Sequence, residues 1–301
     1  MKAYKGFDKD LKCRDFQYEI GKEYEEQEAK ACEKGFHACT NPLNVLQYYP
    51  PCYENRYCEV EQDGKFSENG DDSKVASTKI KIGNEISLEE LIQAAMDKSG
   101  ESGIYSLNTD DHTVTENAEN CSIALNKGYG SMAANTGNYS LAMTIRSFTI
   151  AANTGDYSVA WSQVAHSIAA NIGDGSAALS DGYRSITANT GDRSAAIGYG
   201  EDSVATNVGN QSTAINKGAE SVALNTGERA EASVTQEGSI AIATGIQSKA
   251  KGVLGSAIVL VERTWNGYKY PLNNIKAAIV DGEKIKADTW YTLKNGEFVE
   301  A

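Results

Sequence analysis

The chain has 301 residues, of which 41% are hydrophobic, and a formal net charge of −13 at pH 7. With 28 Gly and only 4 Pro, the composition is typical of a β-rich globular protein of two or three domains and excludes a disordered chain. The acidic balance argues against non-specific binding to nucleic acid or to an anionic membrane surface.

A nine-residue repeat occupies most of the middle of the chain and is built on the phrase Ser-x-Ala-x-Asn-Thr-Gly. Its first position recurs without insertion from Thr113 to Ser248. A unit this short does not fit a helical repeat, but it suits a strand of about five residues followed by a tight corner. The strict corner Asn-[Thr/Ile/Val]-Gly returns in every second unit, so two units form one coil. The sequence therefore predicts a mainly β protein with a two-sheet parallel β-solenoid of about eight coils.

The asparagines of the strict corners are interpreted as structural residues. Asn tolerates turn geometry, and its amide is expected to bond to the Asn one coil away. The glycine two residues further on is expected to supply a positive φ. The corner ladder comprises Asn135, Asn153, Asn171, Asn189, Asn207 and Asn225.

The alternation within each unit leaves two assignments of inside and outside. Positions two and four carry large apolar residues on both sheets, for example Ile123, Leu125 and Trp161. Because so much apolar surface is not expected to face water, we place these positions in the core and the Ser and Ala positions outside. The outward serines would then form a flat binding surface, which includes Ser131, Ser167, Ser185, Ser203 and Ser221. The alternative is a very thin roll with Ser and Ala inside and the apolar residues in an oligomer interface.

The Ser-x-Ala-x-Asn/Gly phrase resembles the head repeats of trimeric autotransporter adhesins, which are β-rolls that trimerise. The likeness covers the repeat alone, and an adhesin function is not carried over from it. The stretches Gly282–Lys286 and Trp290–Lys294 look like uncharacterised proteins of bacteria and their phages, which indicates a source but no activity.

Three domains are predicted: a small α/β domain over 1–103, the solenoid over 104–256 and a C-terminal β-hairpin cap over 257–301. In the first domain, strands are expected at 2–7, 16–24, 35–39, 57–62 and 75–82, and helices at 25–34, 42–49 and 88–98. Ser87 and Glu90 form a capping box for the last helix. No run approaches the roughly twenty apolar residues of a membrane span, and the charged start is not a secretory signal, so a cytoplasmic location is expected.

Five of the six cysteines lie in the first sixty residues, without a C-x-x-C pair. The spacing of Cys32, His37 and Cys39 is unusual for zinc, and the aspartates after the corner glycines lack the phrase of calcium-binding rolls. We therefore expect reduced, mostly buried thiols, and neither a metal nor a cofactor.

The segment Lys34-Gly35-Phe36-His37-Ala38, followed by Tyr48 and the strand at 58–60, resembles the ADP-ribosyltransferase fold of the poly-ADP-ribose polymerase type. Tyr4-Lys5-Gly6 stands where that family has a His or Arg before Gly. The resemblance covers about residues 2–62 and implies a nicotinamide pocket built by His37 and Tyr48, with NAD as the cofactor and Glu85 as the available catalytic carboxylate.

Three functions follow from these observations. The favoured one is a non-enzymatic scaffold or interaction protein, a homo-oligomer that self-associates or holds a protein partner on its solenoid. The second is an ADP-ribosyltransferase-like enzyme, active or degenerate, that binds NAD in the N-terminal domain. The third is a flat face that binds an ordered lattice such as ice or a polysaccharide.

Overall fold

The computed structural model describes residues 1–49, 55–68, 73–102, 105–120 and 122–301. The chain divides into two compact units, Met1–Tyr105 and Ser106–Ala301. The C-terminal hairpins belong to the second unit together with the solenoid.

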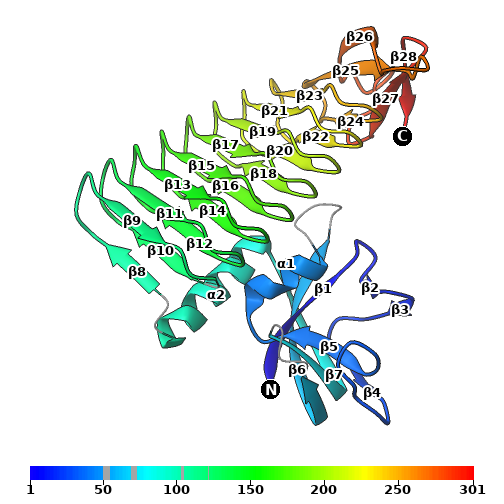
Figure 1. Cartoon of the computed structure of the whole chain (residues 1–301). Helices are drawn as coiled ribbons and strands as arrows, with labels where there is room; N and C mark the ends of the chain where they lie inside the picture. The colour runs from blue at the N-terminus through cyan, green and yellow to red at the C-terminus, as the bar shows by residue number, and fades with distance from the viewer. Residues whose placement is uncertain (50–54, 69–72, 103–104, 121) are drawn as a thin grey trace. The chain divides into compact units, whose positions relative to one another are not determined.

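The N-terminal unit is built on a curved antiparallel sheet in which β1 pairs with β5 and β6, and β7 pairs with β4, β5 and β6 (Figure 1). Because β6 and β7 also pair with each other, the strands β1, β5, β7 and β6 close into a small barrel. The sheet strands are β1 (Lys2–Phe7), β4 (Glu23–Glu25), β5 (Phe36–Cys39), β6 (Arg56–Glu68) and β7 (Lys74–Ile86). The remaining elements are the short pair β2 (Lys12–Cys13) and β3 (Phe16–Gln17), the turn η1 (Pro42–Asn44), α1 (Val45–Tyr48) and α2 (Leu88–Ser102).

The capping box at the start of α2 is present, with the N–H of Ser87 donating to Glu90 Oε2 over 2.7 Å and the N–H of Glu90 donating to Ser87 Oγ over 3.2 Å. The helix predicted at 25–34 is wrong. Its first residue ends β4, Lys30 forms a β-bridge with Lys34, and Cys32 has a positive φ, which the interior of a helix does not allow. The segment is mostly exposed, so it offers no apolar stripe that packing would stabilise as a helix.

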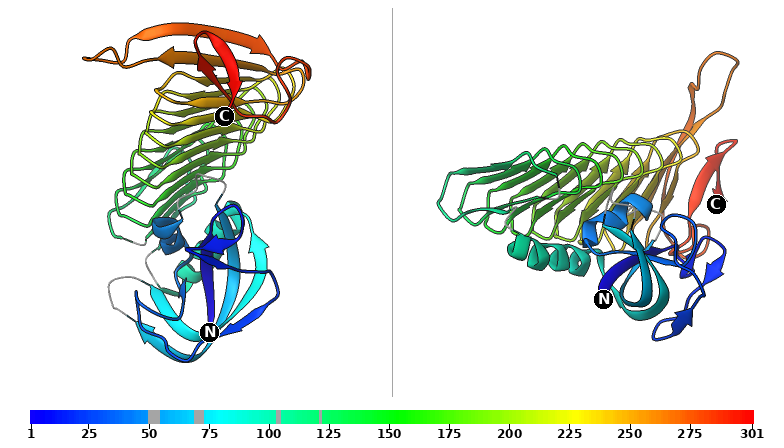
Figure 2. Two further views of the ribbon diagram at one scale, coloured as in Figure 1. Left: turned by 90° about the vertical axis from the view of Figure 1, so that its right-hand side faces the viewer. Right: turned by 60° about the horizontal axis from the view of Figure 1, so that its bottom comes forward.

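The second unit is a parallel β-solenoid of about nine turns with about 18 residues per coil, over the described part of 106–260. Its coils stack in register, so that Ile150 lies beside Ile168 and Asn153 beside Asn171. Figure 2 shows the coils stacked one upon another with a sheet on each side of the coil. We call the ten-stranded sheet the first sheet and the eleven-stranded sheet the second sheet.

The first sheet consists of β9 (Val114–Asn117), β11 (Met132–Asn135), β13 (Ile150–Asn153), β15 (Ile168–Asn171), β17 (Ile186–Asn189), β19 (Val204–Asn207), β21 (Val222–Asn225), β23 (Ile240–Ala243), β25 (Ala257–Arg263) and β26 (Leu272–Ile279). The second sheet consists of β8 (Tyr105–Asn108), β10 (Ile123–Asn126), β12 (Leu141–Thr144), β14 (Val159–Ser162), β16 (Ala177–Ser180), β18 (Ala195–Gly198), β20 (Thr213–Asn216), β22 (Glu231–Val234), β24 (Lys249–Lys251), β27 (Tyr291–Lys294) and β28 (Glu297–Glu300).

Two antiparallel hairpins extend the sheets at the C-terminal end of the solenoid. β26 pairs with β25, and β27 pairs with both β24 and β28. Tyr291 and Leu293 are buried in one cluster with Ile258 and Leu260 of the last coil. The apolar interior of this cap closes the end of the coil, which would otherwise present unpaired backbone groups.

The side chains between the two sheets are the reverse of the favoured sequence assignment, although Ile123, Leu125 and Trp161 of the second sheet are buried as well. The Ser and Ala positions point inward, and Ala151, Ala160, Ala169 and Ala178 form one fully buried cluster. The serines that were expected on the surface are at most 4% exposed. They are Ser131, Ser167, Ser185, Ser203 and Ser221. Ser and Ala therefore lie inside a thin roll, as in the alternative assignment, because the small side chains of both sheets pack against one another.

The buried serines bond to backbone groups of adjacent coils. Ser203 Oγ accepts the N–H of Ser185 over 3.2 Å and donates to the carbonyl of Gly182 over 3.2 Å. Each of the other four serines likewise accepts an N–H from the preceding coil. They therefore satisfy backbone groups that would otherwise be buried without partners.

The corner asparagines are buried as well. They bond to backbone groups, whereas the sequence predicted bonds between asparagines of adjacent coils. Asn171 Nδ2 donates to the carbonyl of Ser158 over 3.0 Å, and its Oδ1 accepts the N–H of Gly173 over 3.0 Å. The same two bonds recur at Asn135, Asn153, Asn189, Asn207 and Asn225.

The corner glycines are required for close approach and not for positive φ. Gly191 has no positive φ, but a Cβ at this position would overlap the carbonyl of Gly173 one coil below. The positive φ falls two residues later, on non-glycine residues such as Tyr157 and Arg193. The glycines thus set the spacing between coils.

Gly191→Ala should lower the free energy of unfolding by about 1–3 kcal/mol, because the added methyl group forces two coils apart. Urea unfolding followed by circular dichroism measures this change. The control Thr190→Ala, at an exposed corner position, should stay within about 0.5 kcal/mol of wild type. Equal effects of the two substitutions would contradict the close-approach explanation.

Candidate functional sites

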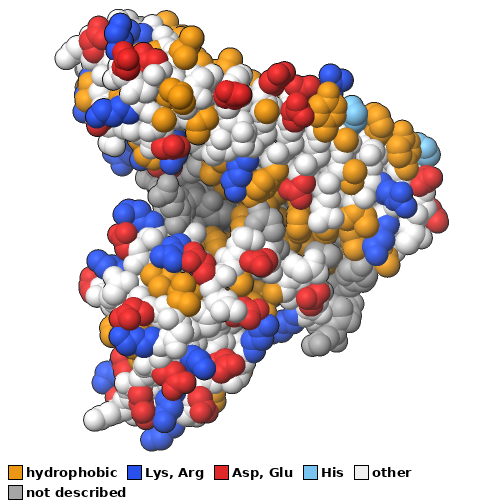
Figure 3. All heavy atoms as spheres, turned by 180° about the vertical axis from the view of Figure 1, so that it is seen from behind, with side chains coloured by type: hydrophobic (Ala, Val, Ile, Leu, Met, Phe, Trp, Pro, Cys, Tyr) orange, Lys and Arg blue, Asp and Glu red, His pale blue; other side chains and the backbone are white. Residues whose placement is uncertain are grey.

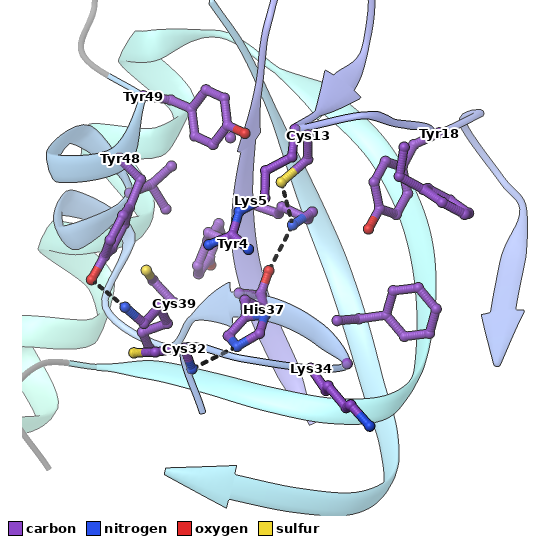
Figure 4. Close-up of a pocket in the computed structure, with 18 of the residues that line it drawn as sticks. Tyr4, Lys5, Cys13, Tyr18, Cys32, Lys34, His37, Cys39, Tyr48 and Tyr49 are labelled. Carbon is purple, nitrogen blue, oxygen red and sulfur yellow. Dashed lines mark hydrogen bonds between the residues drawn. The ribbon is translucent and has the colours of Figure 1, made fainter. Parts of the chain in front are cut away.

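A cavity of about 780 Å³ opens in the N-terminal unit beside β1 and β5 (Figure 4). Its wall combines aromatic rings with charged and thiol groups. The aromatic lining residues are Tyr4, Phe16, Tyr18, Phe36, Tyr48 and Tyr49, and the cationic ones are Lys5, Arg14, Lys34 and Lys74. A concave wall that combines aromatic rings with polar and charged groups suits a small-molecule site.

β1 brings Lys5 into the cavity. The strand lies between β5 and β6 and is buried after its first residue, so Lys5 is only 5% exposed. Its Nζ donates to the carbonyl of His37 over 2.8 Å and lies 3.4 Å from Cys13 Sγ. Burial lowers the pKa of Lys5, because the charged form loses its hydration.

His37 lies on β5, and its ring is held by the backbone. Its Nε2 accepts the N–H of Cys32 over 2.9 Å, so this nitrogen carries no proton. Burial and the nearby Lys5 lower the pKa of His37. His37 is therefore neutral and structurally engaged, and its Nε2 is not available as a general base.

Tyr48 and Glu85 do not share one environment. Tyr48 ends α1 at the cavity, where its hydroxyl accepts a hydrogen bond from Lys74 Nζ over 2.8 Å. Glu85 lies on β7 outside the residues that line the cavity, and Arg56 Nε donates to its carboxylate over 2.8 Å. The Arg56 guanidinium lowers the pKa of Glu85. The structure thus brings together His37 and Tyr48, but not the expected carboxylate.

Four side chains of the cavity wall have no role in the sequence-based site, namely Cys13, Tyr49, Tyr18 and Lys74. Gly6 gives an indirect signal for one of them, since a Cβ at Gly6 would meet the ring of Tyr49 at 2.5 Å. The acidic residues of the wall are Asp15, Glu26 and Glu33. Cys13 and Tyr18 could not be assigned from the sequence, because only the fold places segment 13–18 against β1 and β5.

The second candidate site is the outward face of the first sheet, which we call the outer apolar face. Its two columns are positions two and four of the repeat. The first column is Val114, Met132, Ile150, Ile168, Ile186, Val204, Val222 and Ile240, and the second is Glu116, Ala134, Ala152, Ala170, Ala188, Thr206, Leu224 and Ile242. Every one of these side chains is partly or fully exposed, and Ile186 is 44% exposed.

A ladder of aromatic rings borders this face along one edge of the solenoid. It consists of His112, Tyr129, Phe148, His166 and Tyr183, which we call the ring ladder. Successive ring centroids lie 4.9–6.0 Å apart, and all five residues are exposed. Figure 3 shows pale-blue histidines interleaved with hydrophobic side chains along one edge of the molecule.

The described cysteines Cys13, Cys32, Cys39 and Cys58 form no disulfide with one another, whereas Cys52 and Cys121 lie outside the described residues. Among the described residues, no three His, Cys, Asp or Glu side chains converge on a metal position. In the same part of the chain, no helix combines the length and the apolar character needed to cross a bilayer.

A family model described as a domain of unknown function (DUF7666) matches residues 1–94. The match covers the barrel and its cavity and stops before the solenoid. No curated protein and no solved structure matches the chain.

The neutral state of His37 predicts a pH dependence of the stability of the N-terminal unit. The pKa of His37 is lower in the folded chain than its ordinary value of about 6.5, so the unfolded chain binds the proton more tightly. The stabilisation that neutral His37 gives to the folded chain is complete above about pH 6.5 and should be lost as the pH falls below that value. Pulse proteolysis in urea, detected through an N-terminal tag, measures the midpoint at each pH.

His37→Gln is the matched control for this experiment, because its side-chain oxygen can still accept the N–H of Cys32 but does not titrate. The variant should lose the pH dependence between about 5 and 7. A wild-type midpoint that is constant over this range would show that His37 is not held neutral by the fold.

Proposed function

We propose that the protein is a non-enzymatic scaffold whose copies associate through the outer apolar face of the solenoid. The observation that supports the proposal most directly is the column of Ile, Val and Met side chains that runs, partly exposed, along eight stacked strands. At about 4.8 Å per strand, the face is roughly 38 Å long and roughly 10 Å wide. Such an area, roughly 400 Å², is in the range of the largest exposed apolar patch of a typical monomer, about 300–600 Å², and patches of this size are often functional.

A second copy of the chain is the occupant that this surface favours. The outer columns carry a single charged residue, Glu116 in the first coil, so two copies can meet without burying unpaired charges. The residues repeat at the same spacing on every copy, which makes the face complementary to itself. The ring ladder adds aromatic side chains at the border of the face, where they are typical of interfaces.

Ile168→Glu and Ile186→Glu should convert the wild-type oligomer into a monomer of 32.3 kDa, because each buries a carboxylate in the interface. Analytical ultracentrifugation measures the mass. Thr190→Glu, on an exposed corner outside the face, should leave the oligomer intact. A wild-type chain with the mass of a monomer would contradict self-association.

The expected Ser/Ala binding face is not supported, because the serines are buried and bonded to backbone groups. Because these ladders are buried, they offer no flat surface to which an ordered lattice or a polysaccharide could bind.

A second function is favoured by the cavity. We propose that the N-terminal unit binds NAD without transferring ADP-ribose. The support is that Lys5, His37 and Tyr48 line one cavity, with aromatic rings for the bases and cations for the pyrophosphate. Transfer is not proposed, because Glu85 is bonded to Arg56 away from the cavity.

Isothermal titration of the full chain with NAD should give a saturable heat. Lys74→Ala should weaken the affinity by about tenfold, since it removes a cation from the cavity wall. Lys22→Ala, an exposed cation paired with Glu19, is the control and should bind like the wild type. The absence of heat with the wild-type chain would overturn this second function.

A further inference from the structure

Cys13, Lys5 and Tyr49 form a cluster of nucleophilic and titratable groups in the wall of the N-terminal cavity. Lys5 Nζ lies 3.4 Å from Cys13 Sγ, which is within hydrogen-bonding distance for sulfur. Burial, followed by the interaction with Cys13, raises the pKa of Tyr49, which also lines the cavity. Cys13 itself is half-buried and lines the cavity, so a molecule in the cavity can reach its sulfur (Figure 4).

The surroundings of Lys5 are unusual for a lysine. Its contacts are the carbonyl of His37, the thiol of Cys13 and the rings of Phe7 and Tyr18, whose centroids lie 5.5 and 5.3 Å from Nζ. In the described part of the chain, Lys5 forms no salt bridge. A buried lysine without a carboxylate partner is rare, and such amines act as bases or nucleophiles when they lose their proton.

We propose that Cys13 and Lys5 form a nucleophile–base pair that captures a carbon electrophile in the cavity, namely the α,β-unsaturated carbonyl group of an aromatic small molecule. The two groups meet the geometric requirement for such a pair, because the base is within hydrogen-bonding reach of the nucleophile. The burial that lowers the pKa of Lys5 supports a neutral amine as the proton acceptor.

The reaction needs no further reactant. The neutral amine of Lys5 takes the thiol proton of Cys13 while the sulfur forms a bond to the β-carbon of the electrophile. The π electrons of the carbon–carbon double bond move toward the carbonyl group and give an enolate. The Lys5 ammonium then returns the proton to the α-carbon, which leaves a thioether on Cys13 and a neutral amine on Lys5.

The cavity wall indicates the class of molecule. Phe16 and Phe36 belong to a group of edge-to-face rings with Tyr18 and Tyr24, with centroids 4.7–6.4 Å apart. Such a wall favours an aryl group attached to the reacting double bond. The proposal is independent of self-association through the outer apolar face and does not require NAD.

N-Phenylmaleimide tests the pair in the full chain, with the labelling rate of each cysteine followed by peptide mass mapping. Cys13 should react at least about tenfold faster than Cys32, although Cys32 is the more exposed of the two and also lines the cavity. Cys58 is buried, and burial raises the pKa of its thiol to about 11, so it should react slowest. Cys13 should also react more slowly in urea-unfolded protein than in native protein.

Two substitutions distinguish proton transfer to Lys5 from a purely electrostatic effect of its charge. Lys5→Met and Lys5→Arg should each slow the labelling of Cys13 by about tenfold or more, since neither side chain accepts the proton. Neither should change the rate at Cys32. Lys12→Met, next to Cys13 in the sequence, is the control and should react like the wild type.

Three results would overturn the proposal. In the first, Cys13 reacts no faster than Cys32 or than Cys13 of the unfolded chain, a comparison that remains decisive if the Lys5 variants do not fold. In the second, Lys5→Met reacts at the wild-type rate. In the third, Lys5→Arg reacts at the wild-type rate, which would assign Lys5 an electrostatic role in place of proton transfer.

Discussion

The spacing between coils is the constraint on which the solenoid depends. Backbone hydrogen bonds join each strand to the strand one coil away, and each corner glycine leaves room for a carbonyl of the adjacent coil. The side chains between the two sheets of a coil are mostly small, chiefly Ser, Ala, Asn and Thr. The interior is consequently held together less by apolar bulk than by side chains that bond to the backbone, such as Ser203 and Asn171.

The thin interior explains the surface. An alanine core buries little apolar area per residue, and the larger Ile and Val side chains are left on the outward face of the first sheet. A single chain that exposes such a face gains from covering it, and a second copy offers the same spacing. Architecture and proposed association thus have one cause, which is the small size of the side chains between the two sheets.

The N-terminal unit follows a different principle. Its antiparallel barrel buries Lys5 on a central strand, and β2 brings Cys13 against this lysine. A polar group buried in this way is costly unless it has a function or full hydrogen bonding. The cavity brings together residues far apart in the sequence, from Lys5 to Lys74. Its chemistry therefore belongs to the tertiary structure and not to any local motif.

The sequence alone determined the solenoid, its nine-residue unit, the two units per coil and the α2 capping box, because these features depend on local spacing and composition. It did not determine which face is inside, since an alternating pattern fits either side of a strand. Only the tertiary structure placed Ser131 and Ser167 in the interior, removed the helix at 25–34 and separated Glu85 from His37. Each of these outcomes depends on the distance between segments remote in sequence, which local propensity does not encode.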